Sequence, residues 1–580
     1  MKMSNVRIHN FRSISELDIS VEEFMMFIGA NNAGKSNVIS AIRCFYDDLA
    51  WNDEDFPKFQ TSDKDAWVQI TFSLSEEEWQ SLADVYKAKQ QEVLLSRTLV
   101  LKRWLKGSKV KARQSNIYAV VDGKEDDSLF YGAKNVSSAK CGAVIYIPAL
   151  TTTESQFKTA GTSPFKALLS HFMRKSAGFD KGLEVLRTAF SDFNEVARGE
   201  DGFLTQMQEP INRALKSWGI SLDIRIAPID ANEIGKNLIH PAFVDGVVSK
   251  ERQDIDHFGS GFQRTVIYEL IKAASLLQDV KLDSGKKEFQ PNLMLLLFEE
   301  PEAFLHPAQQ EQMAINLRKV ARQSDAQVFI TSHSPIFVGK MMSEIYQICR
   351  LAKDRSSTVA YQLKSSVAPD YEDVGADFAS RIDNFINDST IPYDKKKKAR
   401  EIKDHSPDVV DMAKFDAFRF QMWLDSLRSS MFFADKVLLV EGETERVLFN
   451  RLLMERWNDL QNERVFVLDA LGKYNFVRYM RFFKAFGIKH GVIYDRDDSL
   501  VDELVINPYI DTEVNEFTLA KPVRLEKKLE DELEISIPGR DDIKPLQVLK
   551  YMDDGTFTEE KHFAKLRNIF CKALDLCATD

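Results

Sequence analysis

Short apolar runs separated by amphipathic segments recur along the chain and fall into two blocks. In the first block, residues 67–74 alternate like a half-buried strand, and residues 117–121 end in an Asp-Gly turn that is typical of antiparallel strands. Residues 36–46 have helical spacing, and Ser75 with Glu78 matches the sequence of a capping box. Buried strands are predicted for four apolar runs, at residues 24–28, 144–147, 293–298 and 328–331.

A second block of strands and helices begins at residue 436. Its elements are predicted in the order strand, helix, strand, helix, strand, at residues 436–440, 443–457, 464–468, 476–486 and 491–494. Strands that alternate with helices indicate a parallel sheet. Polar segments of helical pattern occupy residues 153–235 and 366–428, and the second of these, which lacks a strong core signal, is the best candidate for a linker.

Composition narrows the class of protein. The chain has 580 residues, of which 44% are hydrophobic and 28% charged, as in ordinary globular proteins. A net charge of -11 counts mildly against a nonspecific nucleic-acid binder, and the basic run at residues 395–398 is best interpreted as a solvated linker face. Five scattered cysteines indicate reduced thiols, and neither a signal-peptide core nor a membrane-length apolar run is present, so we expect a cytoplasmic protein with no membrane association.

A phosphate-binding loop is predicted at residues 29–36, which read Gly-Ala-Asn-Asn-Ala-Gly-Lys-Ser. The octet lies between a predicted strand and a predicted helix, as the pattern requires. Backbone N–H groups of such a loop surround phosphates, Lys35 would neutralise charge on the β- and γ-phosphates, and Ser36 would bind Mg²⁺. The alternative, a chance glycine turn, is disfavoured by the complete octet.

A second group of candidate residues follows two of the buried strands. Glu299 and Glu300 end the run at 293–298, where Glu299 can hold Mg²⁺ and Glu300 can polarise the attacking water. His333 follows the run at 328–331 and is a candidate contact for the γ-phosphate. A small-residue turn containing Ser260 and Gly261 opens a helical segment and suits a phosphate, though alone it is a weak signal.

Together these motifs resemble the ABC-type ATPases of the SMC and RecF class. The resemblance includes the opening Asn10-Phe11-Arg12-Ser13, and it implies two heads that enclose two ATP molecules, with each Gly-Ser-Gly-x-Gln signature facing the other head. The chain departs from that class in its Gly-Ser-Gly signature and in having Glu299 where Asp is usual. The residues that the resemblance assigns to nucleotide binding are Arg12, Asn31, Gly34, Lys35, Ser36, Asn37, Ser260 and Gly261.

A second acidic group lies in the C-terminal block. Glu441 and Gly442 end the strand at 436–440, Glu445 opens the next helix, and Asp495 and Asp497 follow the strand at 491–494. Alternate residues of an extended chain face the same side, so both aspartates can join Glu441 at one edge of the sheet. Such convergent carboxylates would bind Mg²⁺, for which Mn²⁺ can substitute, whereas the alternative is a polar surface turn.

These acids, with Leu471-Gly472 between them, resemble the Toprim domain. An ABC-type head followed by a Toprim domain is similar to the OLD (overcoming lysogenization defect) family of ATP-dependent endonucleases, which includes Gabija-type and retron-associated members. The resemblance adds Glu526 as a metal ligand and Lys544 as a cation near the scissile phosphate. It implies a homodimer or higher homo-oligomer formed through the heads and the helical insertion, and a role in antiphage defence, sometimes with a helicase-like protein or a retron RNA–DNA.

The resulting hypothesis is an α/β protein with an ABC-type ATPase domain at 1–365 containing a helical insertion at 153–235, a helical linker at 366–430 and a Toprim nuclease domain at 431–580. It would cleave DNA through Glu441, Asp495, Asp497 and Lys544, under the control of ATP. One rival is a topoisomerase or primase. Another is a non-nucleolytic DNA-binding ATPase or sensor with a vestigial Toprim domain.

Overall fold

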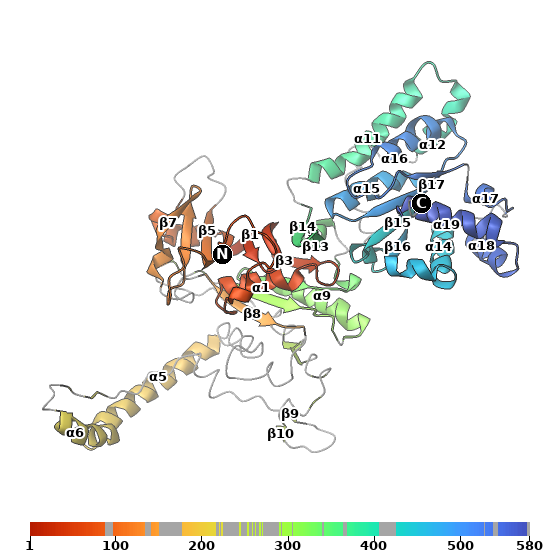
Figure 1. Ribbon diagram of the computed structural model, residues 1–580. Coiled ribbons are helices and arrows are strands. Elements are labelled where there is room, and N and C mark those ends of the chain that lie inside the picture. Colours follow the sequence, from red (N-terminus) through yellow and green to blue (C-terminus); the bar gives the residue numbers. More distant parts are fainter. Residues whose placement is uncertain are drawn as a thin grey trace.

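The chain forms a two-part α/β protein, shown as a computed structural model in Figure 1. An N-terminal head contains two six-stranded sheets, and a C-terminal domain contains a four-stranded sheet. The described residues are 1–87, 97–133, 141–149, 177–215, 220, 222–223, 243–244, 252–253, 258, 262, 266–267, 269–270, 289, 291, 293–303, 305–338, 342–363, 368–404, 425–526, 528–536 and 543–576.

The mixed sheet of the head positions the phosphate-binding loop. Its order is β14 (Ser357–Tyr361), β13 (Ile348–Asp354), β3 (Phe24–Ile28), β12 (Ala326–Thr331), β11 (Met294–Glu299) and β8 (Ala143–Ile147). All its neighbouring strands are parallel except β13 and β14. Central strand β3 is buried on both faces, since Met25 and Phe27 join one hydrophobic core whereas Phe24, Met26 and Ile28 join the other. This explains why β3 is an unbroken apolar run.

The second head sheet is antiparallel and covers one face of the first. Its order is β2 (Ile14–Ser20), β1 (Lys2–Phe11), β4 (Ala66–Ser73), β5 (Thr98–Lys106), β6 (Ile117–Val121) and β7 (Lys124–Leu129). Its alternate apolar residues share a core with helix α1 (Lys35–Phe45) and with Met25 and Phe27. The predicted capping box is confirmed: the Ser75 hydroxyl accepts from the Glu78 amide, and the Glu78 carboxylate accepts from the Ser75 amide.

The C-terminal sheet has the predicted parallel arrangement. Its order is β16 (Val465–Asp469), β15 (Lys436–Val440), β17 (His490–Asp495) and β18 (Val523–Leu525), and all of its neighbours are parallel. Helices α14 (Glu443–Glu455) and α15 (Phe476–Ala485) lie where the sequence predicts them. Strand β18 was not predicted, because a three-residue strand has no periodicity to detect. The expected α/β class with a parallel C-terminal sheet is confirmed.

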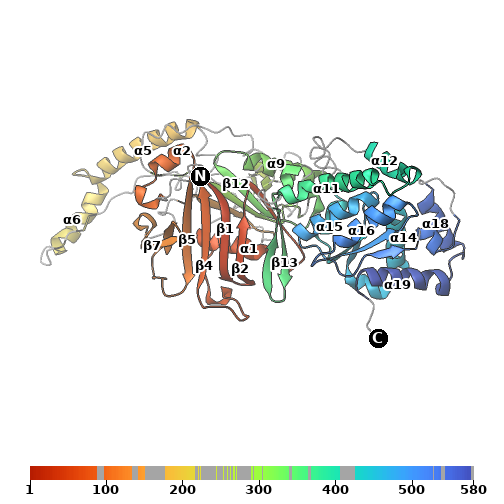
Figure 2. The same cartoon turned by 90° about the horizontal axis from the view of Figure 1, so that it is seen from above.

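Two helices in the range 153–235 extend from the head at the end opposite the C-terminal domain (Figures 1 and 2). They are α5 (Ala177–Arg198) and α6 (Phe203–Leu215). Several large apolar side chains of this pair are exposed, namely Val185, Leu186, Phe193, Val196, Phe203 and Met207. Across the described ranges, no helix combines the length and apolarity needed to cross a membrane.

The segment expected to be a linker contributes to the core instead. Helix α11 (Ala368–Asn387) buries Val374, Ile382 and Phe385 in a cluster shared with the C-terminal domain. Helix α12 (Lys397–Asp404) follows. The interpretation of the basic run at 395–398 as a solvated face is wrong for Lys396, and Lys398 also makes a contact with the core. Lys396 is buried and donates to the Asp388 carbonyl oxygen at 2.6 Å, and Lys398 pairs with the fully buried Asp502. Tertiary packing thus overrides a purely compositional signal.

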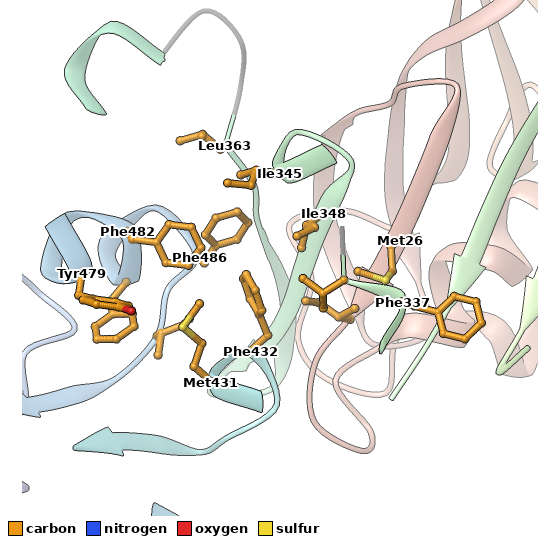
Figure 3. Close-up of a cluster of buried hydrophobic side chains, with 14 of the residues drawn as sticks. Met26, Phe337, Ile345, Ile348, Leu363, Met431, Phe432, Tyr479, Phe482 and Phe486 are labelled. Atoms are coloured by element: carbon orange, nitrogen blue, oxygen red, sulfur yellow. The ribbon is translucent and has the colours of Figure 1, made fainter. Parts of the chain in front are cut away.

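The head and the C-terminal domain share a continuous hydrophobic core (Figure 3). Phe337 and Ile348 of the head join the same cluster as Phe432 and Phe486 of the C-terminal side. At this junction the buried Arg350 guanidinium donates to the carbonyl oxygens of Phe432, Phe486 and Gly487 at 3.1, 3.1 and 2.8 Å. Burial lowers the Arg350 pKa to about 10.

Replacing Arg350 with methionine should lower the free energy of unfolding by about 3 kcal/mol, because three buried carbonyl groups lose charge-assisted donors. Urea unfolding followed by tryptophan fluorescence measures the change. Lys353→Met, at an exposed position on the same strand, is the matched control and should change stability little. Equal stability of the two variants would show that Arg350 does not hold the junction.

Candidate nucleotide and metal sites

The phosphate-binding loop connects β3 to α1, and two of its glycines have no room for a side chain. Gly29 has φ +141°, and a Cβ there would lie 2.1 Å from the Leu351 carbonyl oxygen. Gly34 has φ +107°, and a Cβ there would lie 2.4 Å from Thr358 Oγ1. The Thr358 hydroxyl is donated to the Ala33 carbonyl oxygen at 3.0 Å. The loop is therefore fixed by close backbone packing against β13 and β14.

Lys35 lies across this loop at the start of α1. Its Nζ donates to the carbonyl oxygens of Gly29 and Ala30, both at 2.9 Å. Burial lowers the Lys35 pKa to about 8, while the charges of Glu300 and Glu302 act to raise it. A buried ammonium held by neutral carbonyls is well suited to pair with an anion.

The acids at the end of β11 and the histidine after β12 come together beside Lys35. His333 Nε2 lies 3.7 Å from Glu300 Oε1, and the His333 amide donates to Glu302 Oε1 at 2.6 Å. Burial and the charge of Lys35 lower the His333 pKa, with Glu300 opposing them. Glu300 has φ +46°, a strained value of the kind that clusters at functional sites. Glu302 was missed in the sequence, although it is the third acid in Glu-Glu-Pro-Glu.

Glu299 is held from the neighbouring strand. The Tyr146 hydroxyl of β8 donates to Glu299 Oε2 at 3.0 Å, and the Arg43 guanidinium lies 3.5 Å from the centre of the Tyr146 ring. These contacts hold the side chain of Glu299, which occupies the position where ABC-type ATPases of the SMC and RecF class usually have aspartate. Tyr146 had no sequence signal of its own, because its contact depends on the register of β8 with β11.

The remaining predicted nucleotide ligands divide into three groups. Arg12 Nε donates to Asp55 Oδ1 at 2.8 Å, and the Asn37 amide donates to Ser13 Oγ at 2.7 Å, so both belong to a network beside the loop. Asn31 and Ser36 are exposed. Ser260 and Gly261 lie outside the described residues, and the signature turn stays a prediction.

Glu441 is the central acid of the C-terminal site. It follows β15, and its Oε2 is buried and accepts no hydrogen bond within the described part of the chain. Burial, followed by the charges of Asp497 and Glu445, raises the Glu441 pKa to about 7, against the opposing charge of Lys473. A buried carboxylate with an unpartnered oxygen is costly unless a cation binds there.

The two aspartates after β17 reach the same region. Asp495 and Asp497 are half-buried, whereas Arg496 between them is exposed and pairs with Glu503. Burial, followed by the charges of Glu441, Glu445 and Asp497, raises the Asp495 pKa to about 8. Carboxylates that raise one another's pKa in this way indicate a site for a positive ion.

The residues around Glu441, Asp495 and Asp497 include one acid that the sequence analysis did not name. Glu445 is half-buried, and its Oε2 accepts from the Gly442 amide at 3.1 Å. Glu530, which was not predicted, acts electrostatically on both Asp495 and Glu445, and its Oε1 lies 3.7 Å from Lys544 Nζ. Glu526 has an exposed side chain, and its role as a metal ligand stays a prediction.

One cation inside the acidic site was also missed. Lys473 is buried directly after Leu471-Gly472, and its Nζ lies 3.1 Å from Asp497 Oδ2. As the side chains are placed, no three carboxylate, thiol or imidazole groups of the described residues already form a metal-binding cluster. The oxygen donors and the unpartnered Glu441 oxygen nevertheless fit a hard divalent ion.

The comparisons with known proteins agree with this architecture. The AAA ATPase domain family matches residues 1–136 and 151–338, which is over half of the chain, and the TOPRIM domain of overcoming lysogenization defect protein-like proteins matches residues 432–497. The chain belongs to the AAA ATPase domain family and carries an OLD-like Toprim domain, as the resemblance to the OLD family implied. Nucleotide use and divalent-metal use are general properties of these two domains.

Two relatives span most of the chain. Endonuclease GajA of Bacillus cereus (strain VD045) is 21% identical over 523 residues, covering 86% of this chain and 75% of its own length. The Old nuclease of Escherichia phage P2 is 23% identical over 508 residues, covering 86% of this chain and 77% of its own length. A solved SMC head bound to the C-winged helix domain of ScpA is 15% identical, with a TM-score of 0.36, and covers 63% of this chain and 100% of that chain.

Proposed function

We propose that this protein is an ATP-regulated, metal-dependent DNA endonuclease that hydrolyses phosphodiester bonds at its Toprim site. The observation that carries the proposal is the buried, unpartnered oxygen of Glu441 among carboxylates that raise one another's pKa. The names of the two relatives, an endonuclease and a nuclease, support it.

The C-terminal carboxylates would hold the ion. Glu441, Asp495 and Asp497 would provide the oxygen ligands. The charge of Glu445 acts on Glu441 and Asp495 from nearby. Mg²⁺ or Mn²⁺, when bound, would activate water and offset charge on the scissile phosphate. Hydrolysis then forms one P–O bond to the incoming oxygen and breaks the P–O bond to the leaving oxygen. Lys544 would offset the negative charge that develops in the transition state. Glu530, whose Oε1 lies 3.7 Å from Lys544 Nζ, would orient the Lys544 side chain.

The head would bind ATP with Mg²⁺ and act as the control element. Lys35 would pair with the β- and γ-phosphates, and Ser36 and Glu299 would hold Mg²⁺. Glu300 would polarise the attacking water, and His333 would contact the γ-phosphate. The continuous core between head and Toprim domain gives a physical route by which the head can influence the metal site.

The insertion would join two copies of the chain. Exposed apolar side chains on α5 and α6 support this, because isolated proteins rarely display several large apolar groups on one helix pair. The substrate is DNA, the compartment is the cytoplasm, and the biological role is antiphage defence. A helicase-like protein or a retron RNA–DNA is the expected type of defence partner.

Purified full-length chain incubated with linear, circular and single-stranded DNA, with and without ATP, tests this function. We expect Mg²⁺-supported cleavage that changes when ATP is added and stops with chelator. A covalent protein–DNA adduct would favour a topoisomerase instead. Absence of cleavage on every substrate, together with intact ATP binding, would favour the sensor.

Metal affinity should depend on pH. Mn²⁺ binding to the nucleotide-free chain is expected to tighten by about tenfold or more from pH 6 to pH 8, because Glu441 and Asp495, with pKa values of about 7 and 8, must lose protons to become ligands. Isothermal titration calorimetry at three pH values measures this. A flat profile would contradict the proposed ligands.

The same pKa shifts determine how the free energy of unfolding of the metal-free chain changes with pH. Each folded-state pKa lies above its ordinary value, so the folded chain binds more protons than the unfolded chain between those values. The contribution of these groups to the free energy of unfolding therefore falls as pH rises from about 4 to about 8.

A further inference from the structure

Lys473 is a buried ammonium whose donors all point at the loop carrying the Asp-x-Asp pair. Its side chain is 3% exposed. Nζ donates to the carbonyl oxygens of Asp495 and Arg496 at 2.6 and 3.1 Å and to Asp497 Oδ2 at 3.1 Å. An ammonium has three N–H groups, and these three acceptors account for them.

This contact constrains the backbone on which the metal ligands depend. Two consecutive carbonyl oxygens that accept from one nitrogen fix the orientation of both peptide units. Asp497 itself has φ +58°, a left-handed conformation that costs most L-residues energy and that contacts around the turn help to hold. Lys473 contacts both the residue before the turn and the carboxylate within it, and the side-chain amide of Asn507 also donates to the Arg496 carbonyl oxygen at 2.9 Å.

A buried acid, Asp502, also lies close to Lys473. Asp502 is fully buried, and its Oδ1 lies 3.6 Å from Lys473 Nζ. Its other oxygen, Oδ2, accepts from the Ser499 hydroxyl and from Lys398 Nζ. Lys398 belongs to α12, so one buried carboxylate is shared by an ammonium of the acidic site and an ammonium of the connecting segment. Buried charges are tolerated only with such partners.

We propose that Lys473 is a positioning residue of the Toprim site, which holds the Asp495–Asp497 loop in shape, and that Lys398 and Asp502 hold Lys473 in place. Helix α12 is then a structural part of the nuclease site. The role in cleavage rests on the proposed function, whereas the role in the loop does not. The donors of Lys473 are directed to protein oxygens of the loop, so this lysine acts on the loop and not on DNA.

Hydrogen exchange of the full-length chain, followed by mass spectrometry, tests the proposal without any cleavage assay. Lys473→Met should speed exchange in peptides covering residues 495–502 by at least about tenfold, because three charge-assisted hydrogen bonds are lost. Lys398→Met should accelerate the same peptides by about threefold, since it acts through Asp502. Lys484→Met, at an exposed position on α15, is the control and should leave them unchanged.

Cleavage kinetics give the second readout. Lys473→Met should lower kcat by about 100-fold while KM for plasmid DNA stays within about twofold, since the lysine acts on the ligands and not on DNA binding. Unchanged exchange in Lys473→Met would overturn the positioning role. Unchanged exchange in Lys398→Met would show that α12 does not help to position the Asp495–Asp497 loop. If the wild type cleaves no DNA but the exchange results hold, the proposed function fails and the positioning role stands.

Discussion

Replacing Glu441 with glutamine is expected to reduce metal-dependent DNA cleavage by at least about 1000-fold. Glutamine keeps the size of the side chain but removes its charge, and Glu441 is the acid whose Oε2 is buried without a hydrogen-bond partner. Burial and two neighbouring carboxylates raise its pKa to about 7, so the site is destabilised by that charge until a cation binds. Cleavage of supercoiled plasmid at saturating Mg²⁺ measures the loss.

Glu443→Gln is the matched control for this variant. Glu443 is two residues farther along, is exposed and pairs with Arg446 on the surface of α14, so its loss should change cleavage by less than about twofold. Thermal unfolding of both variants checks that neither loses its fold. Full cleavage by Glu441→Gln would place the chemistry elsewhere in the chain.

Replacing Lys35 with alanine is expected to weaken ATP binding by about 100-fold and to abolish the effect of ATP on cleavage. Lys35 is buried in the phosphate-binding loop, close to Glu300, Glu302 and His333, so it is the cation placed to pair with the β- and γ-phosphates. Binding of a fluorescent ATP analogue and cleavage with and without ATP measure the two effects.

Mn²⁺ binding at the Toprim site should be unchanged in Lys35→Ala, because the phosphate-binding loop contributes no ligand to that site. Lys64→Ala, at an exposed position of the head, is the control and should retain both ATP binding and its effect. If Lys35→Ala bound ATP normally, the loop at residues 29–36 would not be the nucleotide site.

Elements built on unbroken apolar runs could be predicted from the sequence. The run before Glu441 coincides with β15, the run before Asp495 lies within β17, and the run before Glu299 begins one residue ahead of β11, so the three acidic strand ends were placed correctly. A buried parallel strand needs apolar residues on both faces, which leaves a local signal. The clustering of acids at one edge of the sheet then followed from parallel topology alone.

Residues whose role depends on long-range contacts could not be predicted. Lys473 precedes α15 and Asp502 follows β17, so their contact depends on how the chain folds between them, and Lys398 reaches Asp502 from 104 positions earlier in the chain. Glu530 acts electrostatically on Asp495, and its place in the site depends on how the chain turns after β18. Charged residues are common on surfaces, so nothing in their spacing separates these from their solvated neighbours.

Calorimetric titration of Mn²⁺ into the nucleotide-free full-length chain is the most direct test of the central claim that the Toprim carboxylates form a metal centre separate from the ATP site. We predict binding at pH 8 that Glu441→Gln removes and that Lys35→Ala and Glu443→Gln retain. Absence of binding by the wild type, or binding that Glu441→Gln leaves intact, would contradict it.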